Sequence, residues 1–260
     1  MAGGRTTARR RRTVDGHHAR RADDRPLVVY GVNAVLELLR SDAPVTRVSL
    51  SSGARRAEVA AAAAARDVPL TAVDAPALER LAGSPHHQGA VAESPPFAYS
   101  PLERVVGAGT SVLALDGIQD PRNLGALLRT ARAVGVGGVV IPQDRSVGVT
   151  GVVVAASAGL AFGVPIARVP NLVRALGTLK EAGFWVVGLA PEGGTLLFEL
   201  DPPPKPALVV GGEGAGMRVL VRQACDFVVT IPMAPGVESL NVAVAAGVAL
   251  YALAAPRPVR

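Results

Sequence analysis

Six short, solidly apolar runs occur in the second half of the chain, and segments with helical spacing separate them. The runs are SVLALD, GGVVIP, VPIARV, FWVVGL, ALVVGG and DFVVTIP. Strands that are apolar on both faces, rather than alternating, are typical of a parallel sheet with helices on both sides. The pattern therefore predicts an α/β fold built on a parallel sheet.

The first part of the chain predicts a smaller α/β unit. Helical spacing in YGVNAVLELLRS and alternation in VTRVSLS predict a helix and a strand. Further along, the alanine-rich run 54–65 and APALERLAG favour helices, whereas VPLTAV and HHQGAVAES favour strands. The proline-rich stretch SPPFAYSP indicates a boundary. The expected parts are an arm over 1–25, a small domain over 26–93, a linker over 94–110 and a larger domain over 111–256.

Most of the positive charge lies in the predicted arm. The net charge of the 260 residues is +6, and eight arginines with three aspartates put +5 of it ahead of Pro26. An arginine-rich segment with few apolar residues is expected to be disordered and to gain counterion-release free energy on a polyphosphate. The alternatives are a solvated tail without specific contacts and a transit peptide, which shares the arginine-rich, acid-poor composition.

Cysteine content and charge distribution bear on the compartment. The single cysteine, Cys225, permits no intrachain disulfide, so a reduced, cytoplasmic protein is expected. Residues 146–167 carry no charge, which raises the question of a membrane span. Four glycines and Pro165 in that segment favour a buried helix followed by a buried strand, so no membrane association is expected. His86 and His87 lack partners at metal-ligand spacing, so no metal is expected.

Polar residues follow three of the predicted strands, and an open parallel sheet binds ligands at the carboxyl ends of its strands. In LDGIQDPRNLGALLRTARAVG, Asn123 stands at a helix entrance and Arg129 on the polar helix face, where they could also be an N-cap and a solvated arginine. In GGEGAGM, Glu213 lies among four glycines. In IPMAPGVESLNVAVAAGVALYALA, Ser239 is a candidate helix cap, and Asn241 inside that helix requires a polar partner.

Three of these segments resemble a known family. DPRNLGALLRTA, LVVGGEGAGM and IPMAPGVESLNVAVA are similar to the three signature motifs of the SpoU (TrmH-like) branch of the SPOUT methyltransferases, in order and spacing. YGVNAVLELL and HHQGAVA resemble the amino-terminal substrate-binding domain of the 23S ribosomal RNA guanosine 2′-O-methyltransferases of this branch. The resemblance spans nearly the whole chain after the arm.

The resemblance implies an S-adenosylmethionine-dependent enzyme that methylates a ribose 2′-oxygen in RNA, with 23S ribosomal RNA as the expected substrate. It also implies a deep carboxyl-terminal trefoil knot in the larger domain, an RNA-binding role for the small domain, and a homodimer. The positions matching the family's cofactor-binding residues are Gly211, Gly212, Gly214, Ile231, Met233, Ser239 and Leu240. Those matching its polar active-site set are Asn123, Arg129, Glu213, Ser239 and Asn241.

Within that set, Arg129 is the expected residue at the ribose hydroxyl, and Glu213 is expected to orient it through an ion pair. Three other functions are consistent with parts of the sequence. A non-catalytic RNA-binding protein would use the arm and the small domain and would bind no cofactor. An enzyme of the same class could instead methylate tRNA, or could methylate ribosomal RNA to confer antibiotic resistance. A dinucleotide-dependent enzyme is disfavoured, because the G-x-G-x-x-G fingerprint is missing.

Overall fold

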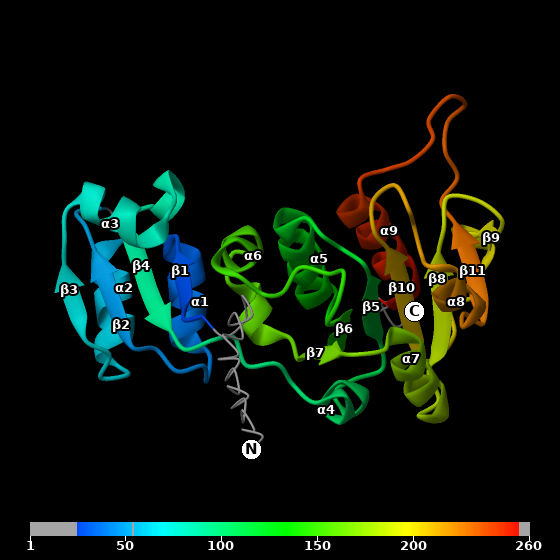
Figure 1. Ribbon diagram of the computed structural model, residues 1–260, viewed down its shortest axis with the longest axis horizontal. Coiled ribbons are helices and arrows are strands. Elements are labelled where there is room, and N and C mark those ends of the chain that lie inside the picture. The colour runs from blue at the N-terminus through cyan, green and yellow to red at the C-terminus, as the bar shows by residue number, and fades with distance from the viewer. Residues whose placement is uncertain (1–24, 54, 255–260) are drawn as a thin grey trace, which may run out of the picture.

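The computed structural model describes residues 25–53 and 55–254, which form two β-sheets lying side by side (Figure 1). The predicted arm lies outside the described residues, except for Arg25. The chain is therefore an α/β protein with a small unit followed by a larger parallel-sheet unit, as the pattern predicts.

The smaller unit is a four-stranded mixed sheet with the order β1-β4-β2-β3. Its strands are β1 (Leu27–Tyr30), β2 (Arg47–Leu50), β3 (Leu70–Ala72) and β4 (Ala90–Ser94). Its helices are α1 (Val32–Arg40), α2 (Arg56–Ala64), α3 (Ala75–Ala82) and the short 3-10 helix η2 (Pro85–His87). Every helix and strand predicted for this unit is present.

The larger unit is a seven-stranded, all-parallel sheet with the order β7-β6-β5-β10-β8-β11-β9. Its strands are β5 (Val112–Asp116), β6 (Gly138–Pro142), β7 (Ile166–Val169), β8 (Trp185–Leu189), β9 (Thr195–Leu196), β10 (Pro206–Gly211) and β11 (Phe227–Thr230). Its helices are α4 (Leu102–Gly107), α5 (Pro121–Val134), α6 (Gly151–Ala156), α7 (Leu172–Glu181), α8 (Val219–Gln223) and α9 (Val242–Ala254), with the 3-10 helices η3 (Leu160–Gly163) and η4 (Leu197–Glu199).

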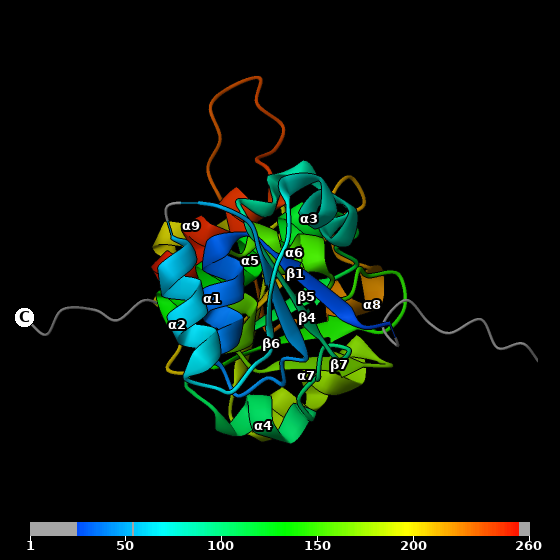
Figure 2. The ribbon, with the colours of Figure 1, turned by 90° about the vertical axis from the view of Figure 1, so that its left-hand side faces the viewer.

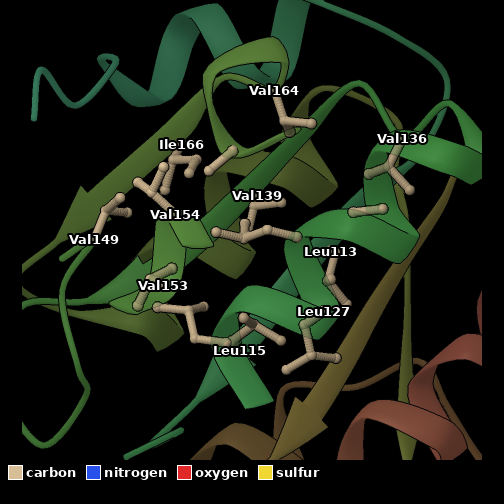
Figure 3. Packing of buried hydrophobic residues seen from close by; sticks show 14 of the residues in the cluster. Leu113, Leu115, Leu127, Val136, Val139, Val149, Val153, Val154, Val164 and Ile166 are labelled. Atoms are coloured by element: carbon tan, nitrogen blue, oxygen red, sulfur yellow. The ribbon is translucent and has the colours of Figure 1, made fainter. Parts of the chain in front are cut away.

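Both faces of the large sheet are covered, which explains why its strands are solidly apolar. Successive residues of a strand point to opposite faces, so Leu113 and Leu115 of β5 pack with α5, α6 and α9, whereas Val112 and Ala114 pack with α4, α7 and α8. Figure 3 shows the first layer, in which Leu113 and Leu115 lie close to Leu127 of α5. All five residues of β5 are buried.

The two units pack directly against each other through glycines. A Cβ atom at Gly151 of α6 would lie 2.1 Å from the carbonyl oxygen of Val28 in β1, and one at Gly159 would lie 2.5 Å from the Cβ of Glu37 in α1. Figure 2 shows α1 and β1 in front of α6 and α5. Side-chain-free positions thus let the backbones of the two units touch, and one apolar cluster continues across the junction.

The structure agrees with the prediction for one segment and adds elements that were not predicted elsewhere. The uncharged segment 146–167 forms the short helix α6, a 3-10 turn and then β7, in agreement with the predicted helix followed by a strand. The predicted linker contains α4, which packs on β6 and β7. Strand β9, two residues long and exposed, was not predicted. Within the described residues, no helix combines the length and apolarity needed to cross a bilayer.

Candidate active site

The three motif segments meet at one edge of the large sheet. Strands β5, β10, β8 and β11 run parallel and are neighbours in that order, so their carboxyl ends lie at the same edge. Asp116 ends β5, Gly211 ends β10 and Thr230 ends β11. The segments that follow these residues contain all the predicted site residues except Gly211 itself.

Asn123 lies in the first turn of α5 and links the other two motifs. Its side-chain amide donates a hydrogen bond to Glu213, and its Oδ1 accepts one from Nδ2 of Asn241 at 3.1 Å. We call Asn123, Glu213 and Asn241 the amide–carboxylate cluster. Asn123 is free to make these bonds because Asp120 caps the helix, accepting a hydrogen bond from the backbone N–H of Arg122 at 2.7 Å. The alternative of Asn123 as the N-cap is therefore wrong.

Asn241 caps α9 rather than lying inside it. Helix α9 begins at Val242, and Oδ1 of Asn241 accepts a hydrogen bond from the backbone N–H of Ala243 at 2.9 Å. The expectations that Ser239 caps this helix and that Asn241 lies within it are corrected, because the helix starts two residues later than a Ser239 cap would place it. The cap position uses one end of the Asn241 amide and leaves Nδ2 for Asn123.

Residues 212–217 form a compact turn, here called the glycine loop. A Cβ at Gly211 would lie 2.1 Å from the carbonyl carbon of Gly216, and a Cβ at Gly212 would lie 2.5 Å from the carbonyl oxygen of Gly117. Gly214 has φ +76° and open space where its Cβ would be. The loop thus folds tightly and is free of a side chain at the exposed Gly214, which suits a ligand that approaches the main chain closely.

Residues 232–241, here called the projecting loop, connect β11 to α9 and stand away from the body (Figures 1 and 2). Ile231 is buried, and Met233 packs against the core at the base of the loop. Ser239 and Leu240 are exposed near its far end. The structure therefore brings Gly211, Gly212, Gly214, Ile231 and Met233 to the strand ends. Ser239 and Leu240 directly precede Asn241 of the amide–carboxylate cluster, but among the described residues no hydrogen bond joins the Ser239 side chain to it.

Arg129 lies apart from the cluster. It is six residues beyond Asn123 on α5, about 9 Å along the helix axis, and it is exposed. In the part of the chain that the structure describes, its guanidinium has no hydrogen bond or ion pair. The expected ion pair with Glu213 is absent, since the Glu213 carboxylate accepts its hydrogen bond from Asn123.

Sequence reasoning missed one polar residue at this edge, Asp116. Its carboxylate accepts two hydrogen bonds from Arg218, the residue that follows the glycine loop. A carboxylate at the end of the apolar run SVLALD is the signal that could have identified it, because a buried charge requires a partner. Among the described residues, no group of three or more His, Cys, Asp or Glu side chains could hold a metal ion.

Comparison with family models gives a match over both units. The SpoU rRNA Methylase family model matches residues 110–251, and a model described as RNA 2'-O ribose methyltransferase substrate binding matches residues 28–100. An uncharacterized tRNA/rRNA methyltransferase of Mycolicibacterium vanbaalenii is 41% identical over 98% of this chain and 83% of its own length.

Solved structures show the same fold. An AdoMet-bound rRNA methyltransferase from Sinorhizobium meliloti matches with a TM-score of 0.75 and 27% identity, covering 88% of this chain and 86% of its own. A TrmH/SpoU tRNA modifying enzyme from A. aeolicus matches with a TM-score of 0.51 and 28% identity, covering 58% of this chain and 78% of its own.

Fold, site and comparisons together define the class of protein, an RNA methyltransferase that uses S-adenosylmethionine. The chain belongs to the SpoU rRNA Methylase family. The alternative of a dinucleotide-dependent enzyme, which the sequence already disfavoured, is thereby excluded. The trefoil knot concerns how the chain threads at the glycine loop and the projecting loop, and it stays a prediction.

Proposed function

We propose that the enzyme transfers a methyl group from S-adenosylmethionine to the 2′-hydroxyl of one ribose in 23S ribosomal RNA. The observation that carries the proposal is the amide–carboxylate cluster, which joins one polar residue from each of the three motifs. Glu213 belongs to the glycine loop, in which Gly214 and Gly216 have open space where a Cβ would be. A non-catalytic RNA-binding protein would not require polar residues of three distant segments to meet at a glycine-rich loop.

The glycine loop and the start of the projecting loop fit the cofactor. Gly214 has open space in place of a side chain, Gly211 and Gly212 let the backbone segments beneath it pack closely, and Ile231 directly follows β11 at the same edge. Met233, Ser239 and Leu240 would complete the site from the projecting loop. S-adenosylmethionine supplies an electrophilic methyl group on a sulfonium, so the protein's task is to position the hydroxyl and manage its proton.

Arg129 is the proposed residue at the ribose. A guanidinium remains protonated in proteins, so Arg129 does not remove the proton as a free base. It anchors the adjacent phosphate and stabilises the oxygen as negative charge develops, and the proton leaves to phosphate or water. Arg122 lies seven residues earlier on the same exposed face of α5, so both arginines are available to the RNA backbone. Asn123 and Asn241 hold Glu213 and the start of α9 in place around the target nucleotide.

Ribosomal RNA is favoured over tRNA by the extent of the structural matches. The rRNA methyltransferase from S. meliloti covers 88% of the chain and so includes the small unit. The tRNA modifying enzyme covers only 58%. A substrate-binding unit shared with an enzyme described as acting on rRNA supports rRNA as the substrate here. We propose the cytoplasm as its location, in keeping with the RNA substrate and the single cysteine.

We also propose a homodimer that forms through α9. Val244 and Tyr251 are 53% and 57% exposed, and they share one face of the helix with Val248. Phe198 of η4, 66% exposed, lines a hollow together with Val248 and Tyr251. An exposed apolar face of this kind marks an interaction surface. Tyr251→Arg should yield a monomer in light scattering; a variant that elutes unchanged contradicts this dimer.

The test of the proposed function incubates the protein with methyl-labelled S-adenosylmethionine and unmodified 23S ribosomal RNA, with tRNA as the comparison substrate. Ribose-methylation mapping should find the label at one 2′-oxygen of the ribosomal RNA. Label in tRNA alone would contradict ribosomal RNA as the substrate and would identify the protein as a tRNA methyltransferase. Absence of label together with absence of cofactor binding in calorimetry would contradict the assignment as an active enzyme.

A matched pair of arginine variants tests the role of Arg129. Arg129→Ala should raise the activation free energy of the reaction by about 3 kcal/mol and so lower the turnover rate. The fold and the cofactor affinity should stay unchanged. Arg174→Ala is the control. Arg174 is likewise an exposed arginine on a helix, α7, and its guanidinium has no hydrogen bond or ion pair among the described residues. Equal turnover in the two variants would exclude Arg129 from the reaction.

A further inference from the structure

Asp116 is a buried carboxylate at the carboxyl end of β5. Its side chain is 0% exposed, and both of its oxygens are bound by a single residue on another segment. Oδ2 accepts the backbone N–H of Arg218 at 2.7 Å, and Oδ1 accepts Nε–H of the same arginine at 2.7 Å. A buried charge with two charge-assisted or backbone donors is satisfied and fixed in orientation.

The same residue also binds the other end of the glycine loop. The backbone carbonyl of Asp116 accepts the N–H of Gly212 at 2.9 Å, next to the point where β10 pairs with β5 at Gly211. Asp116 therefore contacts residue 212 through its main chain and residue 218 through its side chain. The two ends of the glycine loop are held by one residue, which sits on a neighbouring strand and not in the loop.

The shape of the glycine loop depends on these two attachment points to Asp116. Its internal backbone bonds join Gly216 N–H to the Gly212 carbonyl and Ala215 N–H to the Glu213 carbonyl, and both lie within the segment that Asp116 closes. Glu213 reaches Asn123 from the middle of that segment. A change in the end-to-end distance of the loop would therefore move the bare backbone and the Glu213 carboxylate together.

We propose that Asp116 is a positioning residue that holds the glycine loop in the shape that accepts the cofactor. The inference rests on the proposed function in one respect, the assignment of this loop to the cofactor. Asparagine at position 116 would keep the size of the side chain but would direct an NH₂ group at one of the two Arg218 donors. Two facing donors cannot bond, so that end of the loop would be released.

Asp226 provides a matched control within the same sheet. Its Oδ2 accepts the backbone N–H of Val186 at 2.8 Å and its Oδ1 accepts Nζ–H of Lys180 at 2.7 Å, so it also binds one backbone amide and one cation. It lies at the opposite edge, where β8 and β11 begin, and its side chain is 25% exposed. Asp226→Asn thus removes a similar clamp at the other edge of the sheet, and neither of its hydrogen-bond partners belongs to the glycine loop.

The experiment measures the dissociation constant of S-adenosylmethionine by calorimetry for the full chain and three variants, each confirmed as folded by circular dichroism. Asp116→Asn should weaken binding by about tenfold or more. Arg218→Ala keeps its backbone N–H on Oδ2 and loses only the Nε–H bond, so its effect should be intermediate. Asp226→Asn should bind within about twofold of the wild type. If Asp116→Asn does not fold, Arg218→Ala against Asp226→Asn carries the test.

Hydrogen exchange of residues 212–217 separates this inference from the proposed function. Wild-type protein should show slower exchange there when S-adenosylmethionine is added; no change in the wild type would contradict the cofactor assignment of the loop itself. The wild type could instead show this protection while Asp116→Asn and Arg218→Ala bind S-adenosylmethionine with wild-type affinity. That result would overturn the role of Asp116 and leave the cofactor assignment of the loop in place. Equal weakening by Asp116→Asn and Asp226→Asn would overturn it too, because the effect would then be general to the sheet.

Discussion

The glycine loop and the projecting loop lie at the same edge of the large sheet, yet they are held very differently. Asp116 binds residues at both ends of the glycine loop, and the loop makes further backbone bonds within itself. The projecting loop carries one described internal backbone bond, from Val237 N–H to the Ala234 carbonyl, and its residues 234–241 are exposed. One side of the proposed cofactor site is thus formed in advance, whereas the other is still open.

Because of this difference, the two loops should contribute unequally to the free energy of cofactor binding. A loop that is already ordered loses little conformational entropy when a ligand arrives, whereas an exposed loop must be ordered at that moment. The amide–carboxylate cluster joins the two, because Asn123 contacts Glu213 in the glycine loop and Asn241 at the end of the projecting loop. The cluster therefore holds the end of the projecting loop next to α9 and does not contact its middle.

Substitution of Gly211 should have the largest effect, because it disrupts the preformed half. A Cβ at this position would lie 2.1 Å from the carbonyl carbon of Gly216, so Gly211→Ala forces two backbone segments apart. We expect a loss of about 3 kcal/mol in the free energy of unfolding and a loss of cofactor affinity on the order of a hundredfold. Thermal melting and calorimetry measure the two effects.

Gly177→Ala is the control for that substitution. Gly177 lies inside α7, and a Cβ there would meet nothing within 4 Å. Alanine should stabilise this helix by about 1 kcal/mol and leave cofactor affinity unchanged. Cofactor binding by Gly211→Ala with wild-type affinity would show that the glycine loop is not the preformed half of the site.

Asn123→Ala should have the next largest effect, because it disconnects the two loops. Both of its partners are exposed, so water replaces the lost bonds and the free energy of unfolding should change by less than about 1 kcal/mol. Turnover should fall by about tenfold or more, since Glu213 and the start of α9 lose their common anchor. Asn171→Ala removes the N-cap of α7 and is expected to cost stability without altering turnover, and the opposite pattern would refute the connecting role.

Much of the architecture could be predicted from the sequence, because it depends on local patterns. The six apolar runs all became strands of the parallel sheet, and the three-proline stretch lies between the two units. Burial on both faces leaves no polar alternation, so the pattern alone reports how these strands are covered. The start of α9 was misplaced since its apolar residues give no period from which to read a boundary.

The contacts within the site could not be predicted in the same way. Glu213 and Asn123 are 90 positions apart, and Asn241 and Asn123 are 118 apart. Only the strand order brings them together, and one apolar strand resembles another in sequence. The structure thus replaces the expected Glu213–Arg129 ion pair with a hydrogen bond to Asn123. Asp116 was missed for the same reason, because its partner Arg218 is 102 positions away.

Hydrogen exchange should sharpen the comparison of the two loops with a smaller but direct signal. Without cofactor, the amides of residues 234–240 should exchange faster than those of residues 212–217, since most have no described hydrogen-bond acceptor. Added S-adenosylmethionine should slow exchange more in the projecting loop than in the glycine loop, because the former has more order to gain. Amides of β10 serve as the reference. Equal protection of both loops before cofactor is added would contradict the distinction.

The smallest expected effect concerns Cys225, which lies beneath the end of the glycine loop. Met217 and the Cys225 sulfur both pack over Gly188, where an added Cβ would lie 2.8 Å from each. Burial raises the pKa of the Cys225 thiol from its ordinary value of 9.0 to about 11. The folded protein therefore favours the neutral thiol. The resulting contribution to stability is fully present below about pH 9 and is lost as the pH rises through about 11.

The reactivity of this thiol reports whether the glycine loop opens. At pH 7.5 the thiolate is scarce, so alkylation of Cys225 by iodoacetamide should be roughly a hundredfold slower than that of a free thiol. Asp116→Asn should accelerate labelling, because releasing the loop exposes the sulfur beside Met217 and because the Asp116 charge no longer contributes to the raised pKa of the thiol. Cofactor should slow labelling of the wild type only slightly, since the loop is already closed. Mass spectrometry of the labelled peptide measures each rate. A large protective effect of cofactor in the wild type would mean that the glycine loop opens as freely as the projecting loop.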